Sequence, residues 1–169
     1  HFKLGEIFLR FFVGKFQASK TSEFDIDFSK FSSSQSTNIS NLSLISGKSL
    51  IASFKCNVYG FDPTPKSIQW VKENINESKF IMSEFGISNS SKKKKFYLPK
   101  NQDNISGSLF PIDTVNKGDA IMLEFKTLQE VMQNNNHNHL DILKIDIEGA
   151  EYEVLNQIIN QSISINQIV

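Results

Sequence analysis

The stretch that decides the fold is DILKIDIEGAEYEVLNQII, residues 141–159. Its first part, as far as Asp146, is a short apolar run that is typical of a buried strand. After Gly149 the apolar residues recur at helical spacing, at Ala150, Val154, Leu155, Ile158 and Ile159. Glycine at the junction permits a tight turn. We therefore predict a strand that leads directly into an amphipathic helix, with acidic residues at the turn.

The same alternation of strand and helix occurs earlier in the chain. Cys56–Phe61 reads as a buried strand, and Thr64-Pro65 then provides an N-cap residue and a proline at the first helical position. Lys79–Ile87 reads as the next strand. Ala120–Phe125 is a further strand, followed by Thr127-Leu-Gln-Glu130, a capping box. This order predicts an α/β fold of the Rossmann-like type, a mainly parallel sheet with helices on both faces.

Other segments complete the expected domain. Leu42–Ile45 is an apolar run compatible with a short buried strand that ends at Ser46-Gly47, and Ser49–Lys55 could form a short helix. Lys95–Leu98 and Ser108–Ile112 form an antiparallel hairpin insertion, and Ile163–Val169 opens another strand.

The domain boundary is expected at residue 42. Residues 1–41 include a Ser-rich segment and read as a loosely ordered N-terminal lead-in, with a short strand around Phe24–Phe28. Residues 42–169 form the Rossmann-like domain, which we expect to be truncated at the C-terminus because Val169 lies inside a strand. The chain starts with His1 rather than Met, so we expect its N-terminus to be missing.

The composition excludes several classes of partner. The 169 residues carry 18 basic and 18 acidic side chains, so no net field draws the chain to nucleic acid or to a membrane surface. No apolar run is long enough to span a membrane, and Cys56, the single cysteine, has no internal disulfide partner. The default expectation is a cytoplasmic location, and nothing in the sequence predicts an oligomeric state.

Candidate ligand-binding residues lie where the predicted strands end, because ligands of open parallel sheets bind beyond the carboxyl ends of the strands. Gly47 would let the backbone approach a ligand, although turns also need glycine. Asp62 ends the Cys56–Phe61 strand, where a carboxylate can accept hydrogen bonds from both ribose hydroxyls. The alternative is that Asp62 caps the following helix, for which Thr64 is better placed.

A second acidic group follows the strand at Leu140–Asp146. Acidic residues near a helix N-terminus are favoured by the helix dipole, which explains Glu151. It does not explain Asp146 and Glu148, two close carboxylates that repel each other unless a cation, a base or a polar ligand lies between them. Lys144 shares a strand face with Asp146, so we predict an ion pair between them.

Two further groups have a simpler interpretation. The run Lys92–Lys95 could contact phosphates, but a solvated strand edge protected against sheet pairing explains it better. His137 and His139 could bind a metal, yet they lie in an Asn-rich loop without a third ligand. We assign no metal site.

The sequence resembles the FkbM-type methyltransferases of the Rossmann-like, S-adenosylmethionine-dependent class. The blocks that carry the resemblance are VYGFDPTPKSIQWV, FGISNSSKKKKFYLP, ISGSLF, TLQEV and, most specifically, DILKIDIEGAEYEVL, within residues 42–169. The family typically methylates oxygen, so the resemblance implies a hydroxyl acceptor on a small molecule or glycan.

The resemblance also implies roles for individual residues. Asp62 would hold the ribose of S-adenosylmethionine, Gly47 would line its methionine part, and the Gly86–Ser88 segment would pass near the adenine. The implied cofactor-binding set is Gly47, Asp62, Pro63, Gly86, Ile87 and Ser88. The implied catalytic set is Asp146, Glu148 and Lys144, of which Asp146 and Glu148 would face the transferred methyl group or the acceptor.

Two other functions stay open at this point. The family's first loop usually carries more than one glycine, whereas this chain offers only Gly47 there. A non-catalytic relative, either a binding module or a degraded gene product, is therefore the main alternative. A nucleotide-sugar or dinucleotide binder that uses Asp62 is the third, and the missing GxGxxG pattern counts against it.

Overall fold

The computed structural model describes residues 11–15, 50–52, 54–100, 107–147 and 149–169, and all structural statements below concern these residues. The strands expected at 42–45 and 24–28, together with Gly47 and Glu148, lie outside them. The strands are β1 (Phe11–Lys15), β2 (Asn57–Phe61), β3 (Phe80–Ser83), β4 (Gly86–Ile87), β5 (Lys92–Pro99), β6 (Val115–Lys126), β7 (Leu140–Ile145) and β8 (Ile165–Ile168). The helices are α2 (Pro65–Asn74), α3 (Leu128–Asn134) and α4 (Glu151–Asn160).

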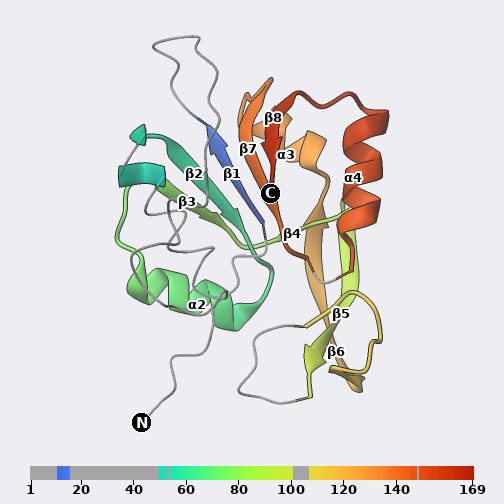
Figure 1. Ribbon diagram of the computed structural model, residues 1–169. Coiled ribbons are helices and arrows are strands. Elements are labelled where there is room, and N and C mark those ends of the chain that lie inside the picture. Colours follow the sequence, from blue (N-terminus) through green and yellow to red (C-terminus); the bar gives the residue numbers. More distant parts are fainter. Residues whose placement is uncertain (1–10, 16–49, 53, 101–106, 148) are drawn as a thin grey trace.

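The larger sheet has five described strands in the order β3-β2-β1-β7-β8 (Figure 1). β2 pairs with β3 and β7 with β8 in parallel, whereas β1 is antiparallel to both β2 and β7. The described sheet is therefore mixed, and the fold is α/β without the mainly parallel sheet that the sequence predicts. The central position belongs to β1, which comes from the segment expected to be a loosely ordered lead-in.

The smaller sheet has the order β4-β6-β5, with β6 parallel to β4 and antiparallel to β5. The expected hairpin is thus present, but the prediction of its second strand is wrong. Val115–Lys126 pairs with β5, and of the expected partner Ser108–Ile112 only Ser108 forms a bridge, to Tyr97. The long alternating segment that includes Ala120–Phe125 offers β5 more pairing positions than the short Ser108–Ile112 segment.

The single strand expected at Lys79–Ile87 is divided between the two sheets. Phe80–Ser83 pairs with β2, and Gly86–Ile87 pairs with β6. The chain leaves one sheet and enters the other within Glu84-Phe85. This change of sheet brings the small sheet close to the ends of the large one.

The main core lies between the large sheet and the helices α3 and α4. It includes Phe61, Ile87, Leu128, Leu140, Leu143, Ile147, Ala150, Val154 and Ile158, all buried. The apolar face of α4 is narrower than the sequence predicts, because Ile159 is 72% exposed. The core thus joins the ends of β2, β4 and β7.

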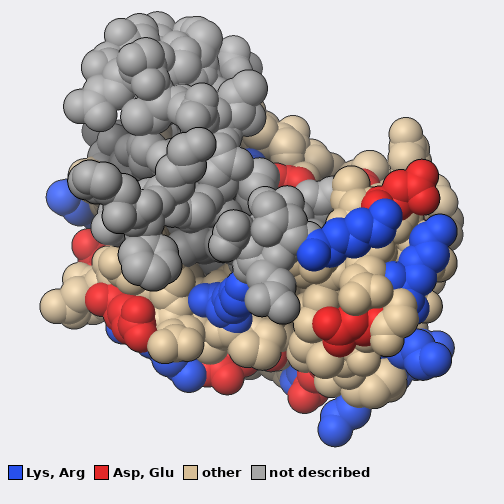
Figure 2. Space-filling model, turned by 90° about the horizontal axis from the view of Figure 1, so that it is seen from below, with Lys and Arg blue, Asp and Glu red and all other residues tan. Residues whose placement is uncertain are grey.

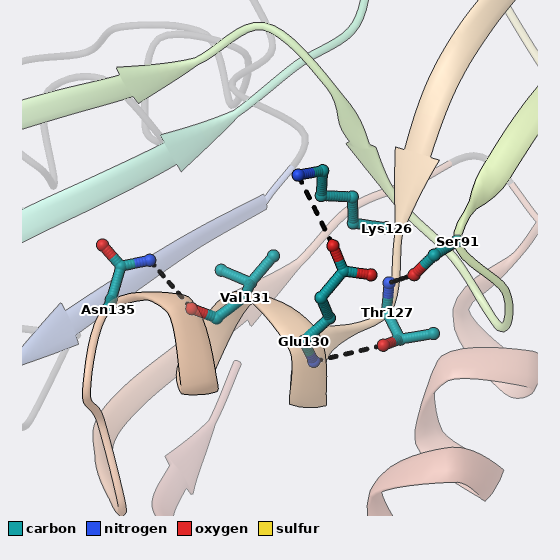
Figure 3. Close-up of polar contacts among 6 residues, drawn as sticks. All are labelled: Ser91, Lys126, Thr127, Glu130, Val131 and Asn135. Carbon is teal, nitrogen blue, oxygen red and sulfur yellow. Dashed lines mark hydrogen bonds and ion pairs between the residues drawn. The ribbon is translucent and has the colours of Figure 1, made fainter.

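Helix α3 begins with half of the predicted capping box (Figure 3). Thr127 Oγ1 accepts a hydrogen bond from Glu130 N at 3.2 Å. The Thr127 N–H donates to Ser91 Oγ at 3.1 Å, and Lys126 Nζ lies 3.5 Å from Glu130 Oε1. The start of α3 is therefore held in part by Ser91, which directly precedes β5 of the smaller sheet.

No helix among the described residues is both long enough and apolar enough to cross a membrane.

Candidate functional site

The carboxyl ends of β2 and β7 lie at the same edge of the large sheet. Phe12 of β1 pairs with Gly60 on one side and with Lys144 on the other, so Gly60 and Lys144 lie at the same position along the strand direction, that is, level with each other. Asp62 and Asp146, each two residues further along, are level as well and each follows its strand directly. At the level of Phe12, where β1 lies between the two strands, the backbones of Gly60 and Lys144 are separated by two strand spacings, about 10 Å. Both strand ends point towards the small sheet (Figure 1).

Asp62 is completely buried at this edge. Its Oδ1 accepts hydrogen bonds from Thr64 N at 2.7 Å and from Thr64 Oγ1 at 2.6 Å. A further hydrogen bond of 2.8 Å joins Thr64 Oγ1 and Ser67 Oγ. Because Thr64 has one hydroxyl proton and donates it to the carboxylate, Ser67 is the donor in that bond. These bonds fix the direction of the Asp62 carboxylate, and Thr64 consequently makes no side-chain cap to α2.

The predicted ion pair at the end of β7 is present. Lys144 Nζ lies 3.7 Å from Asp146 Oδ2, and the side chains are 20% and 34% exposed. The alternation of a strand places both on one face. Asp146 is therefore partly open to solvent and held from one side by a cation.

The turn after Asp146 is organised by two residues. Gly149 has a φ of +98°, which explains why glycine occupies this position. Glu151, the first residue of α4, folds back over the turn: Oε1 accepts from Ile147 N at 2.9 Å and Oε2 accepts from Gly149 N at 2.8 Å. The sequence predicts a dipole role for Glu151 but not this double contact.

A small apolar cavity lies between the strand ends and the small sheet. Its lining consists of Phe61, Pro63, Gly86, Ile87, Phe96, Leu109, Phe125 and Ile147, and its volume is about 20 Å³. Three predicted cofactor-binding residues, Pro63, Gly86 and Ile87, thus meet at one place, together with the residue that follows Asp146. A Cβ atom at Gly86 would lie 2.6 Å from Phe125 Cδ1, so close packing also accounts for this glycine.

Ser88, the remaining member of the predicted set in this segment, has local hydrogen bonds. It is buried, its Oγ donates to Ser90 O at 3.0 Å, and its N–H donates to Lys126 O at 3.0 Å. These contacts hold the connection between β4 and β5. They give Ser88 a structural role next to Ile87, which lines the cavity.

The basic run on β5 lies at an edge strand, as expected. Lys92, Lys93 and Lys95 are exposed, whereas Lys94 is half-buried and its Nζ bonds Asn89 Oδ1 at 2.8 Å. Burial lowers the pKa of Lys94, and the nearby Glu153 partly offsets this. Figure 2 shows basic side chains separated by acidic ones on the face it presents, rather than a continuous basic surface.

The two histidines of the Asn-rich loop are apart from the cavity lining. His137 packs edge-on against Tyr59, with ring centroids 4.8 Å apart. His139 Nδ1 lies 2.8 Å from Ser164 Oγ, and its Nε2 is 3.8 Å from Asp141 Oδ1. Within the described part of the chain, no three metal-ligating side chains come together.

Comparison with protein families identifies the class of protein. Residues 48–169 match the Methyltransferase FkbM domain. The match covers most of the chain, so the protein belongs to the FkbM methyltransferase family and is a methyltransferase. Neither the curated proteins nor the solved structures gave a match.

Proposed function

We propose that this domain transfers a methyl group from S-adenosylmethionine to a hydroxyl oxygen of a small-molecule or glycan acceptor. The observation that supports this most directly is the level placement of Asp62 and Asp146 at one sheet edge, beside a cavity lined by Pro63, Gly86, Ile87 and Ile147. In this proposal Asp62 holds the ribose and Asp146 faces the acceptor.

The chemistry of these residues fits the cofactor. A buried, oriented carboxylate suits two ribose hydroxyls, and a nonpolar lining suits an adenine ring. The cavity itself is too small for the cofactor. Its volume of about 20 Å³ holds roughly one water molecule, whereas ligand pockets measure about 300–1,000 Å³. Cofactor entry therefore requires the wall formed by Phe96, Leu109 and Phe125 to move outwards.

The side chains at the end of β7 would carry out the remaining chemistry. When bound, S-adenosylmethionine supplies a methyl group on a positively charged sulfur, which is already activated for displacement. The Asp146 carboxylate would then orient the acceptor hydroxyl and accept its proton. Lys144, whose Nζ lies 3.7 Å from Asp146 Oδ2, would keep this carboxylate in its orientation. Ile147 and the apolar wall would line the side of the site next to the bound cofactor.

Calorimetric titration of the whole chain with S-adenosylmethionine tests the cofactor site. We expect saturable binding to the wild type and a loss of at least about tenfold in affinity for Asp62→Asn, because an amide accepts fewer hydrogen bonds from the ribose than a carboxylate does. Glu84→Gln is the matched control. Glu84 directly follows β3, one strand from Asp62 at the same edge, but it is exposed and paired with Lys72.

The result separates the two main functions. A folded wild-type chain that binds no S-adenosylmethionine would contradict the proposal and favour a non-catalytic relative. If binding is found, a screen with paired acceptors that differ only in a hydroxyl or an amine tests oxygen as the methylated atom. Methylation of the amine alone would contradict O-methylation while leaving the cofactor site intact.

A further inference from the structure

Glu151 makes contacts that its place in the helix does not require. As the first residue of α4 it needs only to point into solvent to interact favourably with the helix dipole. Instead both carboxylate oxygens accept hydrogen bonds from backbone N–H groups of the preceding turn, at 2.9 Å from Ile147 N and 2.8 Å from Gly149 N. Charge-assisted bonds of this kind are stronger than neutral ones.

The first of these bonds holds the peptide group that follows Asp146. The N–H of Ile147 belongs to the peptide unit that joins Asp146 to Ile147, so the bond to Glu151 fixes the orientation of that peptide plane. The side chain of Ile147 lies in the cavity wall. The bond therefore acts on both the proposed acceptor-facing carboxylate and the wall beside it.

The second bond fixes the other end of the turn. Gly149 has a positive φ, a conformation available to few other residues, and its N–H is held by Glu151 Oε2. Asp146 is held from one side by Lys144 through its side chain and from the other by Glu151 through its backbone. A shift of about 1 Å in such a residue is enough to reduce turnover roughly 100-fold.

We propose that Glu151 is a positioning residue of the methyl-transfer site, which clamps the turn after β7 and so sets the direction of Asp146. This role rests on the function proposed above for Asp146. It differs from helix capping, because the bonded N–H groups, those of Ile147 and Gly149, precede the N-cap residue Ala150. Glu153 shares the first turn of α4 and the same charge but, within the described residues, makes no hydrogen bond to this turn.

Amide hydrogen exchange, measured by NMR on the full chain, tests the clamp without any substrate. In Glu151→Ala both the Ile147 and the Gly149 amides should exchange at least about tenfold faster, and in Glu151→Gln at least one of them should, since Gln keeps a single acceptor oxygen. Glu153→Gln removes the same charge from the same turn and should leave both amides unchanged. Unchanged exchange in Glu151→Ala, or an equal increase in Glu153→Gln, would overturn the proposal.

Kinetics then separate positioning from stability. With a hydroxyl acceptor from the screen, Glu151→Gln should lower kcat about 100-fold while the KM for S-adenosylmethionine stays within about threefold, because Asp62 follows another strand, β2, and is not held by Glu151. A proportional rise in KM without a fall in kcat would count against a positioning role. If the wild type binds no S-adenosylmethionine, the proposed function fails while the exchange experiment still decides whether the clamp exists.

Discussion

Among the described glycines, Gly149 is the one whose positive φ limits substitution. Its φ of +98° is unfavourable for any residue with a Cβ, although the nearest atom to such a Cβ, Phe110 Cδ2, is 3.7 Å away. Gly149→Ala should therefore lower the free energy of unfolding by about 1–3 kcal/mol through strain alone. Urea denaturation measures this, with Gly118→Ala as the control.

Gly118 is a suitable control because it has no positive φ and offers room for a methyl group. The nearest atom to a Cβ at this position, Asn116 Oδ1, would be 3.7 Å away, an ordinary contact distance. Gly118→Ala should leave stability unchanged or slightly raised. Equal effects of the two substitutions would show that the Gly149 conformation is not required.

At Gly86 substitution is limited by lack of space rather than by the backbone conformation. A methyl group there would overlap the Phe125 ring and lie 3.2 Å from Pro63 Cγ. Gly86→Ala should destabilise the chain by about 1–3 kcal/mol, since the buried ring has to move. Phe125→Leu should relieve the overlap, so the double variant should be less destabilised than the sum of the single variants. Strict additivity in denaturation experiments would contradict this contact.

At this scale the sequence predicted contacts between near neighbours and missed those that depend on the turn. The Lys144–Asp146 pair follows from the two-residue period of a strand, and glycine at 149 from the junction of strand and helix. The two hydrogen bonds of Glu151 could not be predicted from the sequence. Its side-chain rotamer depends on two backbone N–H groups, and their orientation is set only when the turn has formed.

Among the elements, α3 has a start that responds to pH. The hydrogen bond from Ser91, and to a smaller extent the charge of Lys126, lower the pKa of Glu130 below its ordinary value of 4.5. A carboxyl group with a lowered folded-state pKa contributes stability above its unfolded pKa, and this contribution is lost as the pH falls through the folded pKa. The contribution is therefore full at neutral pH and absent in strong acid.

Ser91→Ala should show this pH dependence. It removes the donor to Glu130 and also the acceptor for Thr127 N–H, a bond worth about 1 kcal/mol at any pH. The loss in free energy of unfolding should therefore be larger at pH 7 than at pH 2.5, as measured by urea denaturation at both values. Ser90→Ala, whose hydroxyl bonds Asn89 Oδ1, is the neighbouring control. A loss that is the same at both pH values would contradict the role of Glu130.

The elements also mark the limit of local sequence patterns. Strand β2 and the helices α2, α3 and α4 occur where periodicity and capping residues predict them. The division of Lys79–Ile87 between two sheets could not be predicted in this way, because each half pairs with a different strand, β2 or β6. The hairpin partner of β5 was missed for the same reason, since pairing energy depends on the cross-strand neighbours rather than on either segment alone.

For the whole molecule, the decisive feature is the central strand. β1 lies between β2 and β7, although residues 11–15 precede the family match at residues 48–169. Without β1, these two strands would have unpaired backbone groups in the middle of the sheet, and the level placement of Asp62 and Asp146 would lose its common register. A chain of residues 48–169 should therefore fail to unfold cooperatively.

A proline in β1 tests this dependence within the full chain. Val13 pairs with Tyr59 on one side and Leu143 on the other, and proline at this position removes a ladder donor from a central strand. Val13→Pro should lower the free energy of unfolding by about 3 kcal/mol or more relative to Val13→Ala, which shortens the side chain but keeps the N–H. Because β1 sets the register of both acidic strand ends, Val13→Pro should also weaken any binding of S-adenosylmethionine more than Val13→Ala does. Equal urea midpoints for the two variants would mean that β1 is not an integral strand, and the family-matched residues would then have to form the sheet by themselves.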